Sequence, residues 1–143
     1  MQTNFLFRHP SRKSRRTELR AFWREIGKTV GEGREMTCLV TTDAELRRLN
    51  REFRGKDYAT DVLSFPSIGT DAGEIAISWD RAEAQAGDLG HGVDEELRIL
   101  MLHGALHLMG MDHETDNGEM RRAEARWRKK FGLPAGLIER ASV

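Results

Sequence analysis

The segment His103–His113, with the sequence HGALHLMGMDH, restricts the fold of this chain more than any other feature. On a helix its first two histidines, four residues apart, are turned by about 40° and separated by about 6 Å, so both imidazoles can reach one ion. Gly110 comes three residues after His107, where a left-handed glycine ends a helix and turns the chain back, bringing His113 to the same point. The sequence therefore predicts a metal ion held by His103, His107 and His113.

The three predicted ligands indicate a catalytic zinc site. Neutral imidazoles at metal–nitrogen distances of about 2.0–2.1 Å suit zinc, and three protein ligands leave one tetrahedral position for water or substrate. A structural zinc site fills all four positions, usually with cysteines, whereas the single cysteine, Cys38, is distant in the sequence. We therefore expect one Zn²⁺ ion, with nickel and copper as alternatives on ligand type alone.

The same histidine spacing occurs in zinc peptidases that carry HExxHxxGxxH, in which the glutamate activates water. Gly104 stands at the glutamate position here, so the usual proton acceptor is missing. The spacing favours a zinc hydrolase and the glycine argues against peptide cleavage, with a zinc metallopeptidase-like hydrolase as the alternative. Asp112 and Glu114 flank the third ligand and either orient a ligand and handle protons or are merely solvated.

The composition predicts a single domain over residues 1–143. A chain of this length with 38% hydrophobic residues buries about two thirds of its unfolded surface. Lys and Arg total 23, as do Asp and Glu, so affinity for nucleic acid must come from local clusters. These clusters, which are either solvated faces or phosphate contacts, are Arg8, Arg12, Lys13, Arg15 and Arg16, and Arg121, Arg122, Arg126, Arg128, Lys129 and Lys130.

The N-terminal segment predicts a cytoplasmic protein with no membrane partner. Its short apolar patch precedes basic residues, the reverse of a signal peptide, and no apolar run approaches membrane-spanning length. A single cysteine excludes an internal disulfide and suits a reducing compartment. Cys38 lies in an apolar run and is expected in the core.

Hydrophobic periodicity predicts four short strands and about five helices. The strands are expected at Asn4–Phe7, Met36–Val40, Val62–Phe65 and Glu74–Ser78, and the helices at Arg16–Val30, from Thr42 to Gly55, at Trp79–Ala86, from Asp94 through the histidines, and from Asp116 to Phe131. Further expectations are a capping box of Thr42 with Glu45, a buried face of Leu46, Leu49 and Phe53, a loop from Gly87 to Gly92, and a helix cap at Asp94. This order of elements indicates an α+β or α/β layer, with helices covering a small sheet and the histidine-bearing helix central.

A second motif lies in the segment RLNREFRGKDYATDVLSFP, a charged loop that leads directly into an apolar strand. Together with HGALHLMGMDH and the strand GEIAIS, it resembles the YbeY family of bacterial endoribonucleases over most of the chain from Met36 to Phe131. The resemblance implies a zinc-dependent, single-strand-specific endoribonuclease that acts in ribosomal RNA processing, notably at the 3′ end of the small-subunit RNA, and in ribosome quality control. It also implies a small mixed sheet, and as partners single-stranded or ribosomal RNA and the small ribosomal subunit, but not DNA.

The resemblance also assigns roles to individual residues. His103, His107 and His113 match the family's zinc ligands, and Arg54 matches an arginine with a catalytic role. An arginine beside a metal can hold a phosphate with its planar fork of donors, although without the resemblance a plain surface arginine is the simpler interpretation. Met111 departs from a frequent family tyrosine. A non-catalytic, ribosome-associated metal-binding module remains an alternative, and the sequence predicts neither the general base nor the oligomeric state.

Overall fold

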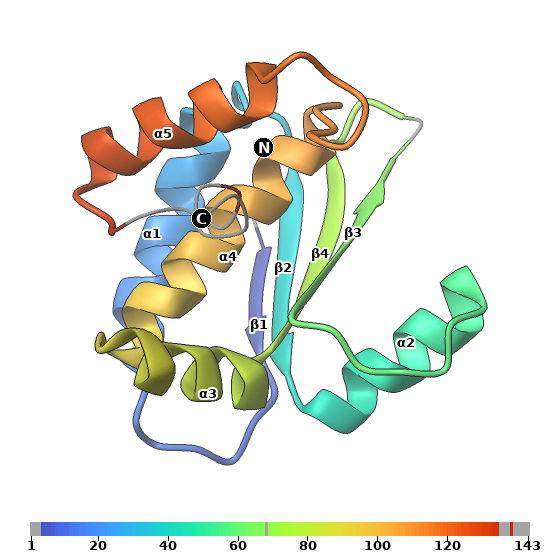
Figure 1. The fold of residues 1–143 in the computed structure, drawn as a ribbon, viewed down its shortest axis with the longest axis vertical. Helices are drawn as coiled ribbons and strands as arrows, with labels where there is room; N and C mark the ends of the chain where they lie inside the picture. The colour runs from blue at the N-terminus through green and yellow to red at the C-terminus, as the bar shows by residue number, and fades with distance from the viewer. Residues whose placement is uncertain (1–3, 68, 135–137, 139–143) are drawn as a thin grey trace.

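The computed structural model describes residues 4–67, 69–134 and 138, which contain a four-stranded sheet and five helices (Figure 1). The elements are β1 (Asn4–Phe7), α1 (Arg16–Lys28), β2 (Met36–Thr41), α2 (Asp43–Arg54), β3 (Val62–Pro66), β4 (Gly73–Ser78), α3 (Trp79–Leu89), α4 (Val93–Leu108) and α5 (Glu119–Phe131). The predicted α+β class and all four strands are confirmed, with strand ends that differ by at most one residue. Within the described residues no helix is both long and apolar enough to cross a membrane.

The sheet is mixed, with the strand order β1-β2-β4-β3. β1, β2 and β4 run parallel, and β3 pairs antiparallel with β4 at one edge. Pro66 is tolerated in β3 because an edge strand does not need every backbone N–H for pairing. A Cβ at Gly73, which faces Pro66 across this pair, would lie 2.3 Å from the Phe65 carbonyl oxygen, so only glycine permits this close approach.

Helices cover the two faces of the sheet unequally. The larger core lies under α1, α4 and α5, and Ile75 and Ile77 of β4 point into it, as does the buried Cys38. A smaller cluster of Leu46, Leu63 and Ala76 lies on the opposite face, beneath α2. Because α4 packs on β3 and β4 and also contacts α1, α3 and α5, it is central, as the sequence predicted.

Helix α2 extends outward from the sheet (Figure 1), so its last turn is not buried as the sequence predicted. Leu46 is fully buried, Leu49 is half-buried, and Phe53 is 66% exposed, so the prediction of a buried Phe53 was wrong. The apolar spacing is helical, but the sheet ends before the helix does. The capping box is half formed: Thr42 Oγ1 accepts from the Glu45 backbone N–H at 3.2 Å, while the Glu45 carboxylate pairs with Arg48.

Two predictions around α3 and α4 were also wrong. Helix α3 continues through Gly87 to Leu89 and ends at Gly90, whose φ of 75° is left-handed. A glycine inside a helix costs only about 1 kcal/mol, and the packing of α3 on α4 outweighs it. The N-cap of α4 is Gly92, because the Asp94 carboxylate instead accepts a hydrogen bond from the Arg15 backbone N–H at 2.9 Å.

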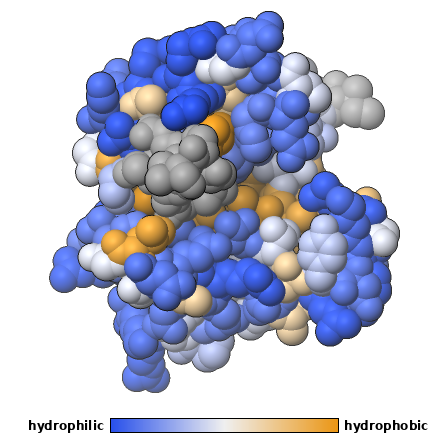
Figure 2. Space-filling model, viewed as in Figure 1, coloured by the Kyte–Doolittle hydropathy of each residue, from blue (hydrophilic) through white to orange (hydrophobic). Residues whose placement is uncertain are grey.

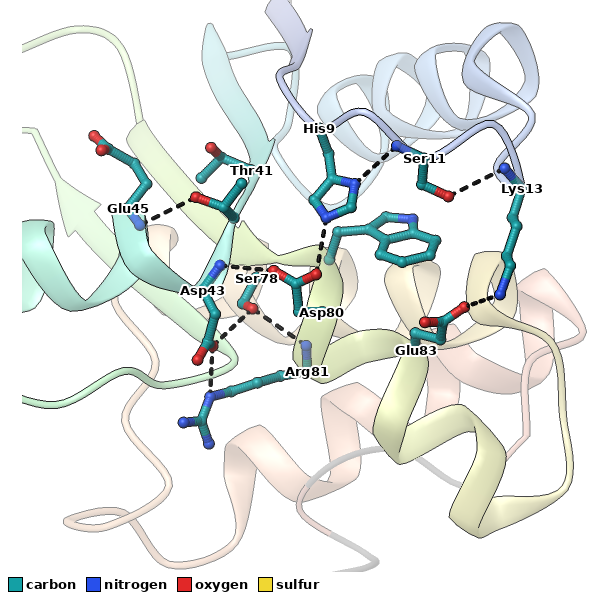
Figure 3. Close-up of polar contacts among 12 residues, drawn as sticks. His9, Ser11, Lys13, Thr41, Asp43, Glu45, Ser78, Asp80, Arg81 and Glu83 are labelled. Atoms are coloured by element: carbon teal, nitrogen blue, oxygen red, sulfur yellow. Dashed lines mark hydrogen bonds and ion pairs between the residues drawn. The ribbon is translucent and has the colours of Figure 1, made fainter.

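A polar network ties the segment after β1 to the first turns of α2 and α3 (Figure 3). His9 Nε2 lies 2.9 Å from Asp80 Oδ1, and Asp80 Oδ2 accepts from the Asp43 backbone N–H at 2.9 Å. Lys13 also pairs with Glu83 at 2.6 Å. His9 therefore has a structural role.

Candidate metal centre

The last turns of α4 and the loop after it bring three histidines together. His103 and His107 are one helical turn apart on α4, and Gly110 adopts a left-handed φ of 90° just beyond its end. The N–H of Met111 then returns to the Leu106 carbonyl at 3.1 Å, which closes the helix end. One ring nitrogen from each of His103, His107 and His113 lies within 4.8 Å of the others, so this cluster could hold a metal ion.

Hydrogen bonds orient two of the rings toward a common point. His103 Nδ1 lies 2.8 Å from Glu124 Oε2, and His107 Nδ1 lies 2.9 Å from the Met111 carbonyl oxygen. Both partners are acceptors, so the ring protons belong on Nδ1 and the lone pairs on Nε2. The two Nε2 atoms are 3.2 Å apart, close to the distance of about 3.3 Å between two nitrogens that bind one tetrahedral zinc ion.

Glu124 is a site residue that the sequence analysis missed. It is 1% exposed on α5, and its second oxygen accepts from the Ile138 backbone N–H at 2.9 Å. A carboxylate behind a metal-binding histidine fixes the ring orientation and raises the basicity of the ligand nitrogen. The sequence does contain one indication of this role: Glu124 lies at helical spacing between Met120 and Trp127, so an acid interrupts the apolar face of the helix.

The surroundings also favour the neutral form of His107. Burial, and after it the neighbouring His103 imidazole, lowers the pKa of His107 below its ordinary value. A neutral imidazole is the form that binds a metal. The donor set therefore fits a zinc ion, which accepts three imidazoles and leaves a position for a reactant.

A cleft of about 550 Å³ opens over the histidine cluster. Its lining residues are Arg54, Val62, Ser64, Pro66, His103, His107, Gly110, Met111, Asp112, His113 and Glu114. Arg54 thus comes from the end of α2 and faces the histidines across the edge strand β3. Its side chain is exposed and makes no hydrogen bond or ion pair with any described residue.

The loop after α2 is held by residues on the helix itself, which leaves Arg54 unpaired. Arg47 donates two hydrogen bonds to Asp57, at 2.9 and 3.2 Å. The buried Asn50 donates through Nδ2 to the Tyr58 carbonyl at 2.9 Å. Asp57 is therefore a structural residue of the RGKD segment, and periodicity alone did not reveal the roles of Arg47 and Asn50.

The two residues before His113 make contacts that shape the site. Asp112 Oδ1 accepts from the Glu114 backbone N–H at 3.0 Å, so Asp112 shapes the turn that carries His113. Met111 contacts His107 through its carbonyl oxygen, which any residue type supplies. A tyrosine at position 111 would make the same contact.

Gly104 has a packing role rather than a catalytic one. It is buried, and a Cβ at this position would lie 3.0 Å from two side-chain carbons of Ile75 on β4. A glutamate here would point into the sheet rather than into the cleft. The peptidase arrangement HExxH is thus incompatible with the packing of α4.

The two basic clusters have different surroundings. In the N-terminal cluster Arg15 bonds Asp94 at the start of α4, which a helix rise of 1.5 Å per residue places about 14–20 Å from His103 and His107, while Lys13 pairs with Glu83 on α3. In the C-terminal cluster all members except the half-buried Arg128 are exposed on α5. Neither cluster lines the metal cleft.

The fold and the site define a small α+β protein in which three histidines that could hold a metal ion line a cleft together with an unpaired arginine. The family described as "Endoribonuclease YbeY" matches residues 9–132. The protein named endoribonuclease YbeY in Solibacter usitatus (strain Ellin6076) is 57% identical over 134 residues, covering 94% of this chain and 91% of the relative. The one in Koribacter versatilis (strain Ellin345) is 54% identical over 125 residues, covering 87% and 82%.

The fold is also similar to a solved structure. The solution structure of TM1509 from Thermotoga maritima has a TM-score of 0.59 and 26% sequence identity, covering 86% of this chain and 85% of that one. Together with the sequence matches, this confirms the resemblance seen in the motifs. The chain belongs to the YbeY family.

Proposed function

We propose that this protein is a zinc-dependent, single-strand-specific endoribonuclease. The observation that carries the proposal is the cleft in which three converging imidazoles face the free guanidinium of Arg54. A Lewis acid and a fixed positive charge each stabilise the transition state of phosphodiester cleavage, and this cleft provides a place for both. The name endoribonuclease, borne by relatives up to 57% identical, supports the same reaction.

His103, His107 and His113 would hold the zinc ion. A zinc ion bound there supplies Lewis acidity, either toward a phosphate oxygen or toward water whose pKa it lowers to about 7. Glu124 and the Met111 carbonyl keep the Nδ1 protons of His103 and His107 in place, so that each Nε2 stays available.

Arg54 binds the scissile phosphate in this proposal. Arginine offers a planar, positively charged fork of donors that matches two phosphate oxygens, so it stabilises the charge that develops during cleavage. Of the two acids beside His113, Asp112 already accepts a hydrogen bond, whereas the Glu114 carboxylate accepts none from the described residues. Glu114 is thus the better placed of the two to take a proton.

We place this activity in the processing of ribosomal RNA, including the 3′ end of the small-subunit RNA, and in ribosome quality control in the cytoplasm. This part of the proposal is supported by family membership and by the two sequence motifs. The partners would be single-stranded ribosomal RNA and the small ribosomal subunit.

The proposal is tested with protein purified without chelator. Mass spectrometry should find one zinc per chain, and the protein should cut a labelled single-stranded RNA but neither the matching duplex nor a peptide. Arg54→Ala should keep its fold and its metal and lose about 10²–10³-fold in kcat. Full activity of this variant would remove Arg54 from the mechanism.

Two outcomes would support the other functions. Cleavage of the peptide instead of RNA would indicate a metallopeptidase-like hydrolase. Absence of any cleavage, together with unfolding of His107→Ala, would indicate a module whose metal is structural.

A further inference from the structure

Two aromatic side chains near Arg54 face solvent. Phe53 directly precedes Arg54 and is 66% exposed, and Tyr58 follows four residues later and is 54% exposed. Large exposed hydrophobic side chains are rare in the described part of the chain, where the others are Leu6 and Leu89. Exposed aromatic rings therefore concentrate beside the arginine that lines the metal cleft.

The Phe53 ring is held in one place. It packs edge-on against Phe65 of β3, with ring centroids 5.7 Å apart and an interplanar angle of 67°. Phe65 is followed by Pro66, which lines the metal cleft. Successive residues of a strand point to opposite faces, so the edge strand β3 alone separates the cleft from the Phe53 ring.

Phe53 borders a groove on the α2 side of the sheet. Its volume is about 470 Å³, and its apolar lining includes Leu39, Leu49, Phe53, Phe65 and Ala76. The groove exists because α2 diverges from the sheet and leaves part of this face uncovered. In the view of Figure 2 the surface is mostly hydrophilic, and apolar residues show in a hollow band between α2 and the helices across the sheet.

Unpaired cations beside the groove favour a nucleic acid strand as its ligand. Inside the groove Arg48 is paired with Glu45 and Glu52, and Glu74 is a further lining residue, so the lining is acidic and only the uncharged base of a strand fits there. Arg54 and Lys56 are exposed and form no ion pair with the described residues. An aromatic ring next to unpaired cations is the combination that binds single-stranded nucleic acid, with bases stacked on the ring and phosphates on the cations.

We propose that a nucleobase next to the scissile phosphate stacks on Phe53 in the groove between α2 and the sheet, while Arg54 holds that phosphate. This inference rests on the proposed function. The RNA strand would cross the edge strand β3, with its phosphate on the cleft side and its base on the groove side. Only an unpaired base can turn its face to a protein ring, so this contact selects single strands, and stacking makes it tolerant of base identity.

The test compares variants of Phe53 in the zinc-loaded protein. Binding is measured with a single-stranded 2′-O-methyl oligonucleotide that carries 2-aminopurine, whose fluorescence is quenched when it stacks. Phe53→Ala should raise Kd about 5- to 100-fold and abolish the protein-induced quenching. Phe53→Tyr should stay within about 3-fold of the parent because it keeps the ring, whereas Phe53→Leu, which keeps apolar bulk, should behave like the alanine variant.

The matched control is Leu89→Ala, which removes a side chain that is 48% exposed on α3. Its RNA binding should be unchanged, and every variant should retain one zinc. An abasic site in place of the stacked base should remove the difference between the parent protein and Phe53→Ala.

The outcomes separate the two proposals. If the parent protein neither binds nor cuts single-stranded RNA, the proposed function and this inference both fail. If the parent cuts RNA and Phe53→Ala binds and quenches like Leu89→Ala, only the stacking site is overturned, and the groove is left for a protein partner.

Discussion

Replacing Glu124 by glutamine tests whether this buried carboxylate orients the metal centre. Its two oxygens accept hydrogen bonds from the His103 ring at 2.8 Å and from the Ile138 backbone N–H at 2.9 Å. A glutamine has the same shape but only one oxygen. In the zinc-bound protein, where Nε2 of His103 is a ligand and Nδ1 carries the proton, either His103 or the backbone N–H must then face the NH₂ group, a donor against a donor.

The magnitude follows from these two contacts. A buried donor left without an acceptor costs about 1–3 kcal/mol. Loss of the carboxylate behind a ligating histidine weakens metal binding about 10- to 100-fold, which equals about 1.4–2.7 kcal/mol. Glu124→Gln should therefore raise the zinc Kd about 10- to 100-fold and lower the free energy of unfolding of the zinc-bound protein by about 1–3 kcal/mol.

The zinc Kd is measured by competition with a chromophoric chelator, and stability by urea unfolding. Glu25→Gln, a change of the same kind at an exposed position on α1, serves as the control and should alter neither value. If Glu124→Gln binds zinc as tightly as Glu25→Gln, the carboxylate does not tune His103 and our account of the site is wrong.

Four further predictions concern other parts of the molecule. Arg54→Lys keeps the charge but loses the planar fork, so kcat on RNA should fall about tenfold or more, and an unchanged kcat would contradict a two-point phosphate contact. Gly104→Ala should lower the free energy of unfolding by about 1–3 kcal/mol, because its Cβ would crowd β4, and a neutral result in urea unfolding would refute this packing role. Burial by itself raises the pKa of Asp80, but hydrogen bonds from the Asp43 N–H and from His9 outweigh it and lower that pKa below its ordinary value of about 3.9. The stabilisation is thus present above about pH 3.9 and lost as the pH falls through the lower pKa of the folded state, so Asp80→Asn should destabilise the protein in urea at pH 7 and not at strongly acidic pH; a constant difference would show that ionisation is irrelevant. Free zinc at about 1,000 times its Kd should add about 4 kcal/mol to the free energy of unfolding, and a melting temperature insensitive to chelator would exclude such linkage.

Local features of the fold could be predicted from the sequence because they depend on near neighbours. The four-residue spacing of His103 and His107 places both rings on one side of a helix, and Gly110 adopts the predicted left-handed conformation. The apolar runs at Asn4–Phe7 and Glu74–Ser78 form strands. In each case the backbone geometry follows from residues within a few positions.

Features that depend on packing between elements could not be predicted from the sequence. Phe53 has the spacing of a buried residue, but the last turn of α2 extends beyond the sheet, so the ring is exposed. Gly87 has the character of a loop residue, but α3 packs on α4 and the helix continues through it. Periodicity indicates which face of a helix is apolar, whereas the length of the surface beneath that face is a tertiary property.

The candidate metal centre also has a part that the sequence predicts and a part that depends on packing. The sequence by itself determined the three histidines and the turn that gathers them, because all three lie within eleven residues of chain. Only the tertiary structure brought Glu124 behind His103 and Arg54 into the cleft, since they lie 21 and 49 positions away along the chain. Contacts across such separations depend on how α5 and α2 pack around the sheet and α4, and no local pattern encodes that arrangement.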